Sequence, residues 1–121
     1  MRGEEWVVEL ERAELTARGR SDLANHVDWV SKSRGDGLGY DVASFTAAGE
    51  PKHIEVKTTN LGPRAPFYLT RRELAVSGEL SVGFNLYRVF EFARDPHLFI
   101  VTGELSSQVH LEPLLYHARV G

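Results

Sequence analysis

The residues best suited to chemistry are Glu55 and Lys57, two positions apart in the segment 53–59. This segment reads as a β-strand, in which successive side chains point to opposite faces of the sheet. Glu55 and Lys57 therefore share one face with Thr59, while Val56 points the other way. A carboxylate and an ammonium group on one face can share a divalent ion and an attacking water.

A second carboxylate, Asp41, lies near the start of the segment 40–45, which also reads as a strand. If the two strands pair, Asp41 and Glu55 converge on one ion. Hard cations such as Mg²⁺, or Mn²⁺ in its place, take carboxylate oxygens and keep several waters, so two acids suffice as protein ligands. Lys57 would orient or help deprotonate the water, or stabilise charge on a phosphate.

These residues also have structural interpretations. Glu55 and Lys57 would commonly form an ion pair that only solvates an edge strand. His53 shares the face of Glu55 and is a candidate for substrate contact, although a surface role is the simpler reading. The glycine-rich segment 35–39 leads into a strand rather than a helix N-terminus. We interpret it as a tight connection that positions Asp41, not as a phosphate loop.

The first element that must support this site is a helix from Glu4 to Arg18, which Gly19 ends. Its apolar residues form two sectors on a helical wheel. Glu4 and Glu11 fall inside the second sector, which is unusual for acids on a helix face directed at a core. Alternatively, both acids lie in solvent near the helix start, where they suit the helix dipole.

The remaining pattern predicts an α/β domain with a mixed sheet flanked by helices. Thr70 and Glu73 match a capping box that opens a helix ending near Ser77. The expected order is helix, three strands, helix and further strands, with a last segment that is an edge strand or a tail. The expected strands and this last segment are 27–31, 40–45, 53–59, 86–92, 98–102 and 111–118.

Composition limits the class of protein. The 121 residues suit one domain, and no linker divides positions 1–121. There are no cysteines, which excludes disulfides and thiolate metal sites and favours a reducing compartment. No signal-peptide pattern or long apolar run is present, so we expect a cytoplasmic protein without membrane contact. The net charge of −3 argues against a protein that coats nucleic acid, although positions 52–72 hold five basic residues.

Four stretches together resemble a known family, the NO VEIN C-terminal (DUF3883) family. This family is placed among the PD-(D/E)XK, restriction-endonuclease-like proteins. The likeness runs from Gly3-Glu4 to the region 111–113, which is nearly the whole chain. The stretches are GDGLGYDVASF at 35–45, IEVKTT at 54–59, PFYLTRRE at 66–73 and LYRV at 86–89.

The resemblance implies a restriction-endonuclease-like sheet and a metal-dependent phosphodiester hydrolase. In that superfamily an aspartate at a strand start and an E-x-K in the next strand bind Mg²⁺ and carry hydrolysis, roles that pass to Asp41, Glu55 and Lys57. Many members add a glutamate from the first helix, for which Glu4 is the candidate and Glu11 an alternative. The usual proline before the aspartate is replaced here by Tyr40.

Two functions follow as hypotheses. The first is a Mg²⁺-dependent nuclease acting on DNA in defence or repair, with substrate contacts from Thr59, Arg71, Arg72 and His53. The second is a binding or sensing module that keeps the fold without turnover and is attached to or recruited by a larger protein. The acidic net charge favours the second hypothesis, or a homodimer or larger partner that supplies part of the DNA surface. Fold alone does not decide between them.

Overall fold

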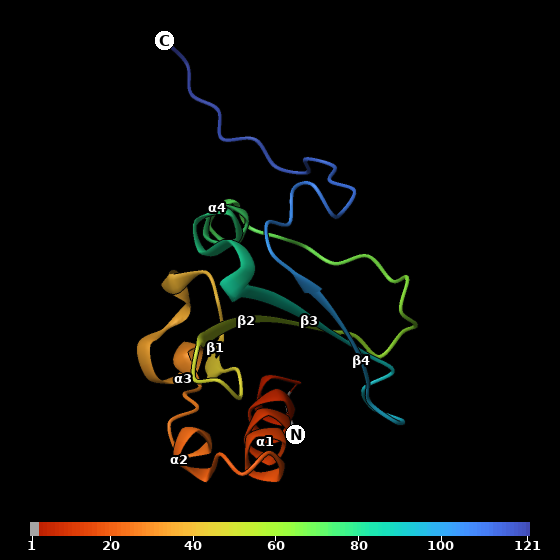
Figure 1. Ribbon diagram of the computed structural model, residues 1–121. Helices are drawn as coiled ribbons and strands as arrows, with labels where there is room; N and C mark the ends of the chain where they lie inside the picture. Colours follow the sequence, from red (N-terminus) through yellow and green to blue (C-terminus); the bar gives the residue numbers. More distant parts are fainter. Residues whose placement is uncertain (1–2) are drawn as a thin grey trace.

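A computed structural model describes residues 3–121 and shows a mixed α/β arrangement around an open sheet (Figure 1). Two short 3₁₀ turns, Asp36–Leu38 and Ser81–Gly83, complete the regular structure of these residues. The helices and strands are α1 (Gly3–Ala17), α2 (Ser21–Ala24), α3 (Val30–Arg34), β1 (Val42–Phe45), β2 (Pro51–Thr58), α4 (Arg71–Leu80), β3 (Phe84–Phe90) and β4 (His97–Thr102).

The four strands lie in the order β1-β2-β3-β4. The two outer pairs are antiparallel, whereas β2 and β3 run parallel and are joined by the crossover through α4. α1 and α2 lie on one side of the sheet and α4 lies on the other (Figure 1). Apolar residues accordingly form two cores, one under α1 and a smaller one under α4.

The first helix follows the sequence prediction closely. Val7, Val8 and Leu15 are buried against the sheet, and the helix gives way to Gly19 in a left-handed conformation (φ 75°). Its N-terminal end packs against the end of β2. A Cβ atom on Gly3 would lie 1.9 Å from Thr58 Oγ1, so this close approach requires glycine.

The prediction of a strand at 27–31 is wrong. The predicted order of three consecutive strands after the first helix is therefore wrong as well. Only a single bridge, Asp28 to Ala43, remains of it, and Val30 begins α3. The physical reason lies in the side chains that follow Asp28. Trp29 Nε1 donates to Glu4 Oε1 at 2.7 Å, and the Ser31 hydroxyl donates to the same oxygen. These bonds turn the segment toward α1 instead of along the four-residue strand β1.

The other predicted elements are present with shifted ends. The capping box is confirmed, since Thr70 Oγ1 accepts from Glu73 N and Glu73 Oε1 accepts from Thr70 N, and α4 runs three residues beyond Ser77. The segment 111–118 is the tail and not an edge strand: residues 111–121 are exposed, without helix or strand, and lead away from the sheet (Figure 1). Among residues 3–121, no helix has the length and apolar character needed to cross a membrane.

Candidate functional site

Asp41 and Glu55 meet on the α4 side of the sheet. Asp41 precedes β1, and its backbone N–H donates to the Ile54 carbonyl at 2.7 Å. Its side-chain Oδ2 accepts from Val56 N at 2.9 Å, which holds the carboxyl group over β2. Glu55 is 3% exposed, and its carboxyl group lies within hydrogen-bonding reach of that of Asp41. The antiparallel pairing of β1 with β2 therefore produces the convergence expected from the sequence.

The pKa values of both carboxyl groups are raised. Burial, followed by the hydrogen bond with Asp41 and its negative charge, raises the pKa of Glu55 to about 11. Burial also raises the pKa of Asp41, although hydrogen bonds from Glu55 and Val56 N work in the opposite direction. With its pKa at about 11, Glu55 keeps its proton at neutral pH and can donate it to Asp41. Two carboxyl groups within hydrogen-bonding reach of each other cannot both be ionised unless a cation lies between them.

Lys57 lies on the same face, as strand alternation requires, but its nearest partner comes from α4. Its Nζ lies 3.0 and 3.1 Å from the two carboxylate oxygens of Glu73. Glu73 thus caps α4 and binds Lys57 with one side chain. The sequence showed Glu73 only as a capping residue, because its contact with Lys57 depends on the path of the crossover.

The glycine-rich turn before Asp41 is held against α4. Gly39 has φ 80°, and a Cβ atom there would lie 2.7 Å from Val76 Cγ2. Both the left-handed conformation and the close approach require glycine at this position. The segment is a tight connection that leads into β1, as we inferred, and it brings α4 close to Asp41.

Of the two helix glutamates, Glu4 lies at the site. Its carboxylate accepts from Trp29 and Ser31, and its negative charge contributes to the raised pKa of Asp41. Glu11 lies on the opposite face of the sheet. The two acids are about two helical turns apart, and the N-terminal end of α1 is the end nearer Asp41.

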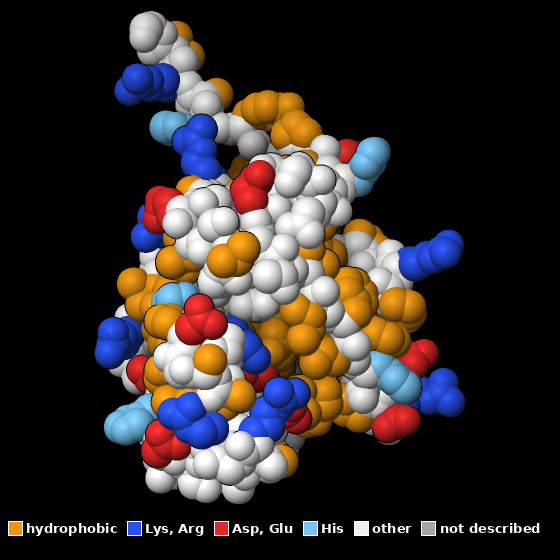
Figure 2. Space-filling model, in the orientation of Figure 1, with side chains coloured by type: hydrophobic (Ala, Val, Ile, Leu, Met, Phe, Trp, Pro, Cys, Tyr) orange, Lys and Arg blue, Asp and Glu red, His pale blue; other side chains and the backbone are white. Residues whose placement is uncertain are grey.

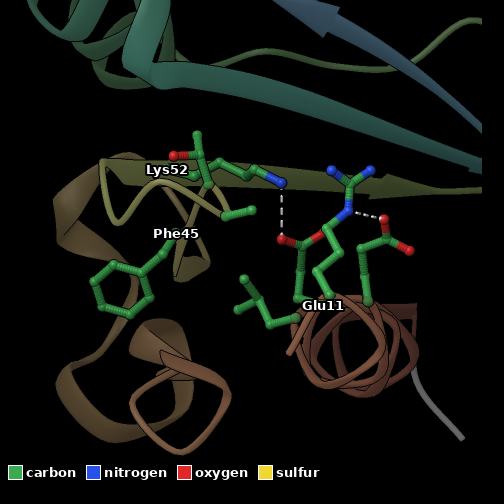
Figure 3. Close-up of a pocket in the computed structure, with 8 residues that line it drawn as sticks. Glu11, Phe45 and Lys52 are labelled. Carbon is green, nitrogen blue, oxygen red and sulfur yellow. Dashed lines mark hydrogen bonds and ion pairs between the residues drawn. The ribbon is translucent and has the colours of Figure 1, made fainter. Parts of the chain in front are cut away.

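Glu11 belongs to a separate buried cluster, 4% exposed and fully hydrogen-bonded. Its carboxylate accepts from Tyr87 OH at 2.7 Å, Ser44 Oγ at 2.8 Å and Lys52 Nζ at 3.0 Å. Burial and the Glu11 charge raise the pKa of Tyr87. A pocket of about 190 Å³ adjoins this cluster, with Lys52 of β2 reaching toward Glu11 of α1 and Phe45 on the far side (Figure 3). These four side chains satisfy one another's hydrogen bonds, so the cluster ties α1 to the sheet.

The four residues expected to contact substrate are dispersed. His53 faces the α4 side but packs edge-on against Tyr40 at 4.7 Å between ring centroids, and burial lowers its pKa. Thr59 Oγ1 accepts from Leu61 N at 3.1 Å and shapes the turn after β2. Arg71 and Arg72 are exposed on the first turn of α4, next to Glu73.

Arg88 is a charged residue beside the site that the sequence reasoning did not single out as functional. It is 1% exposed on β3, in register with Lys57. Its Nη2 donates to the Ala65 carbonyl at 3.1 Å, and its guanidinium lies 4.9 Å from the centre of the Phe67 ring. The alternation of side chains along β3 could have identified Arg88 from the sequence, because it places Arg88 on the same face as the buried Phe84 and Leu86.

The donor set at Asp41 and Glu55 suits a hard cation. Within residues 3–121, no group of three or more His, Cys, Asp or Glu side chains is arranged to hold a metal ion. Two carboxylates with water completing the coordination is the arrangement that Mg²⁺ commonly adopts. A cation bound by both groups would replace the proton that Glu55 holds at neutral pH.

Comparison with known proteins adds one result. No curated protein and no solved structure matches the chain. A family model described as Protein NO VEIN, C-terminal, matches residues 3–101, a stretch that includes every residue of the site described above. The match spans well over half of the sequence, and the chain therefore belongs to the NO VEIN C-terminal family.

Proposed function

We propose that this protein is a Mg²⁺- or Mn²⁺-dependent nuclease that hydrolyses phosphodiester bonds in DNA, acting in the cytoplasm in defence or repair. We further propose that its mixed sheet is a form of the PD-(D/E)XK, restriction-endonuclease-like fold. The observation that carries the proposal is the hydrogen-bonded pair of half-buried Asp41 and buried Glu55, with Lys57 on the same sheet face. Buried acids that share a proton beside a lysine are costly to keep for structure alone.

Asp41 and Glu55 would hold the cation. When bound, the cation would neutralise charge on a phosphate and activate an attacking water. Asp41 is preorganised for this role, because the Val56 N–H fixes one of its oxygens at 2.9 Å. Glu4 accepts hydrogen bonds from Trp29 and Ser31 and contributes negative charge near Asp41.

Lys57 would act on the phosphate. An ammonium group has three N–H donors, and Glu73 oxygens lie in reach of two of them. The third is available for a phosphate oxygen, whose negative charge it would stabilise. Glu73 thereby keeps the Lys57 side chain in one orientation.

The substrate surface would extend over the exposed Arg71 and Arg72 on α4. In the face shown in Figure 2, Lys and Arg side chains are scattered among Asp and Glu and do not form one continuous basic area. Together with the net charge of −3, this supports a requirement for a second copy or a larger partner to complete the DNA surface.

The alternative is a binding or sensing module without turnover. The observation that favours it is the pairing of Lys57 with both oxygens of Glu73, which neutralises the ammonium in the absence of substrate. In that case the Asp41–Glu55 pair would retain its proton and would not take a divalent ion.

Titration with Mg²⁺ or Mn²⁺ by calorimetry, together with a cleavage assay on single- and double-stranded DNA, tests the proposal. We expect ion binding and cleavage in the natural protein, and loss of both in Asp41→Ala. Glu79→Ala, which removes an exposed carboxylate from α4, is the matched control and should behave like the natural protein. Cleavage that continues in EDTA, or that survives Asp41→Ala, would refute the proposed site. If the natural protein neither binds the ion nor cleaves DNA, the result favours the binding module.

A further inference from the structure

Arg88 carries a positive charge that the described residues leave uncompensated. It is 1% exposed, yet no carboxylate within residues 3–121 forms an ion pair with it. The acids of the proposed site have other partners, Glu73 with Lys57 and Glu55 with Asp41. A buried charge normally requires a partner because desolvation penalises the charged form, and burial indeed lowers the pKa of Arg88.

The hydrogen bonds of Arg88 are also incomplete. A guanidinium group has five N–H donors in a planar fork. Nη2 donates to the Ala65 carbonyl at 3.1 Å, while Nε is buried without an acceptor among the residues that the structure describes. A buried donor without an acceptor is rare in folded proteins and calls for an explanation.

Two contacts of the Arg88 guanidinium come from one segment of chain. Ala65 and Phe67, which contact the guanidinium, both belong to residues 61–69, which form no helix or strand. Parts of this segment are well exposed, with Leu61 at 67% and Tyr68 at 78%. The hydrogen bond to Ala65 and the cation–π contact with Phe67 help to hold this segment over the guanidinium. Phe67 and Leu69 also pack against the core under α4, and the Leu61 carbonyl accepts from Glu91 N at 2.9 Å.

Arg88 also lies beside the proposed reaction site. It pairs in register with Lys57 across the parallel strands β2 and β3, and both side chains belong to the α4 face. Strands in a sheet are about 4.8 Å apart, so one phosphate group could span the two cations. A planar fork suits an oxyanion, which it can bind through two parallel hydrogen bonds.

We infer that Arg88 is a phosphate-binding residue of this site, uncovered when the segment 61–69 moves away from it. The identity of the phosphate as part of a DNA strand rests on the proposed function, whereas oxyanion binding by Arg88 does not. The phosphate would accept from Nε and one terminal nitrogen, replacing the Ala65 carbonyl as the partner of the fork. Lys57 would contact the same phosphate or the next phosphate along the DNA strand.

The test is binding of a labelled single-stranded oligonucleotide to the full chain in EDTA, measured by fluorescence anisotropy over a range of salt concentrations. Without divalent ions there is no cleavage, so the result does not depend on catalysis. We expect Arg88→Met to lower the affinity about tenfold or more and to reduce the salt slope by about one. Arg88→Lys keeps the charge but loses the fork, and should fall between Arg88→Met and the natural protein.

Arg18→Met is the matched control. It removes an exposed arginine from the end of α1 on the opposite side of the sheet, where its partner is Glu14, and it should leave the affinity nearly unchanged. Inorganic phosphate provides a second readout, because it should raise the melting temperature of the natural protein, raise that of Arg88→Lys less, and leave that of Arg88→Met unchanged. This readout also covers the case in which Arg88→Met folds poorly, since Arg88→Lys retains the charge.

The inference is overturned if both Arg88 variants bind the oligonucleotide as tightly as the natural protein does and respond equally to phosphate. Arg88 would then serve packing alone. Loss of oligonucleotide binding in the variants, combined with the absence of cleavage under any condition, would support the phosphate site while rejecting the nuclease.

Discussion

Replacing Glu55 by glutamine tests whether Glu55 is protonated in the folded chain, as its raised pKa implies. The ordinary pKa of this carboxyl group is 4.5, and the fold raises it to about 11. At neutral pH the folded chain therefore keeps a proton that the unfolded chain releases. A group of this kind contributes its full stability below the ordinary pKa, and the contribution declines as the pH rises toward the folded value.

The magnitude follows from proton linkage. One proton bound only by the folded state changes the free energy of unfolding by about 1.4 kcal/mol per pH unit. Between pH 6 and pH 8 the natural protein should lose roughly 3 kcal/mol through this group. This loss is a large part of the free energy of unfolding of a typical domain, which is roughly 5–15 kcal/mol. The amide introduced by Glu55→Gln can still donate to Asp41 but does not titrate, so this component should vanish in that variant.

The assay is urea unfolding in EDTA at pH 6, 7 and 8, followed by the fluorescence of the two tryptophans, Trp6 and Trp29. The slope for the natural protein should exceed that for Glu55→Gln by about one proton. Comparing the two proteins cancels other titrations, including that of His53, whose pKa burial lowers. Glu79→Gln, at an exposed position, should keep the natural slope. Equal slopes for the natural protein and Glu55→Gln would show that Glu55 is ionised in the folded state, and the reasoning would fail.

Three further outcomes follow from the same geometry. Binding of Mg²⁺ at neutral pH should release about one proton from the Asp41–Glu55 pair, seen as a calorimetric heat that depends on the buffer; Asp41→Asn should abolish it, and a heat independent of buffer would contradict the shared proton. Lys57→Met should lose DNA cleavage while keeping Mg²⁺ binding, because an ammonium group is not a ligand; calorimetry and the cleavage assay together distinguish this from loss of the fold. Gly3→Ala should lower the free energy of unfolding by about 1–3 kcal/mol through overpacking against Thr58, whereas Gly62→Ala, where a Cβ meets nothing within 4 Å, should cost much less.

Local rules in the sequence determined part of this protein. Alternation along β2 placed Glu55 and Lys57 on one face, because the period of a strand does not depend on what surrounds it. The capping box at Thr70 opened α4, and the helix that precedes Gly19 formed as its apolar pattern indicated. Each of these features depends on residues a few positions apart.

Tertiary structure decided the rest, because the partners are distant in the chain. The segment 27–31 has a strand-like pattern, but bonds from Trp29 and Ser31 to Glu4 turned it toward α1, and α3 begins within it. The same packing brought Glu4 near Asp41 and placed Glu11 in a separate cluster, a choice that their common helix stripe left open.

The charge partners within the site were decided in the same way. Lys57 meets Glu73, and Arg88 lies beside Lys57, because the chain crosses over through α4 and returns parallel to β2. A sequence pattern shows which face a side chain occupies. It does not show which groups face it across the sheet, and that determines whether a buried charge is neutralised, shares a proton or awaits a ligand.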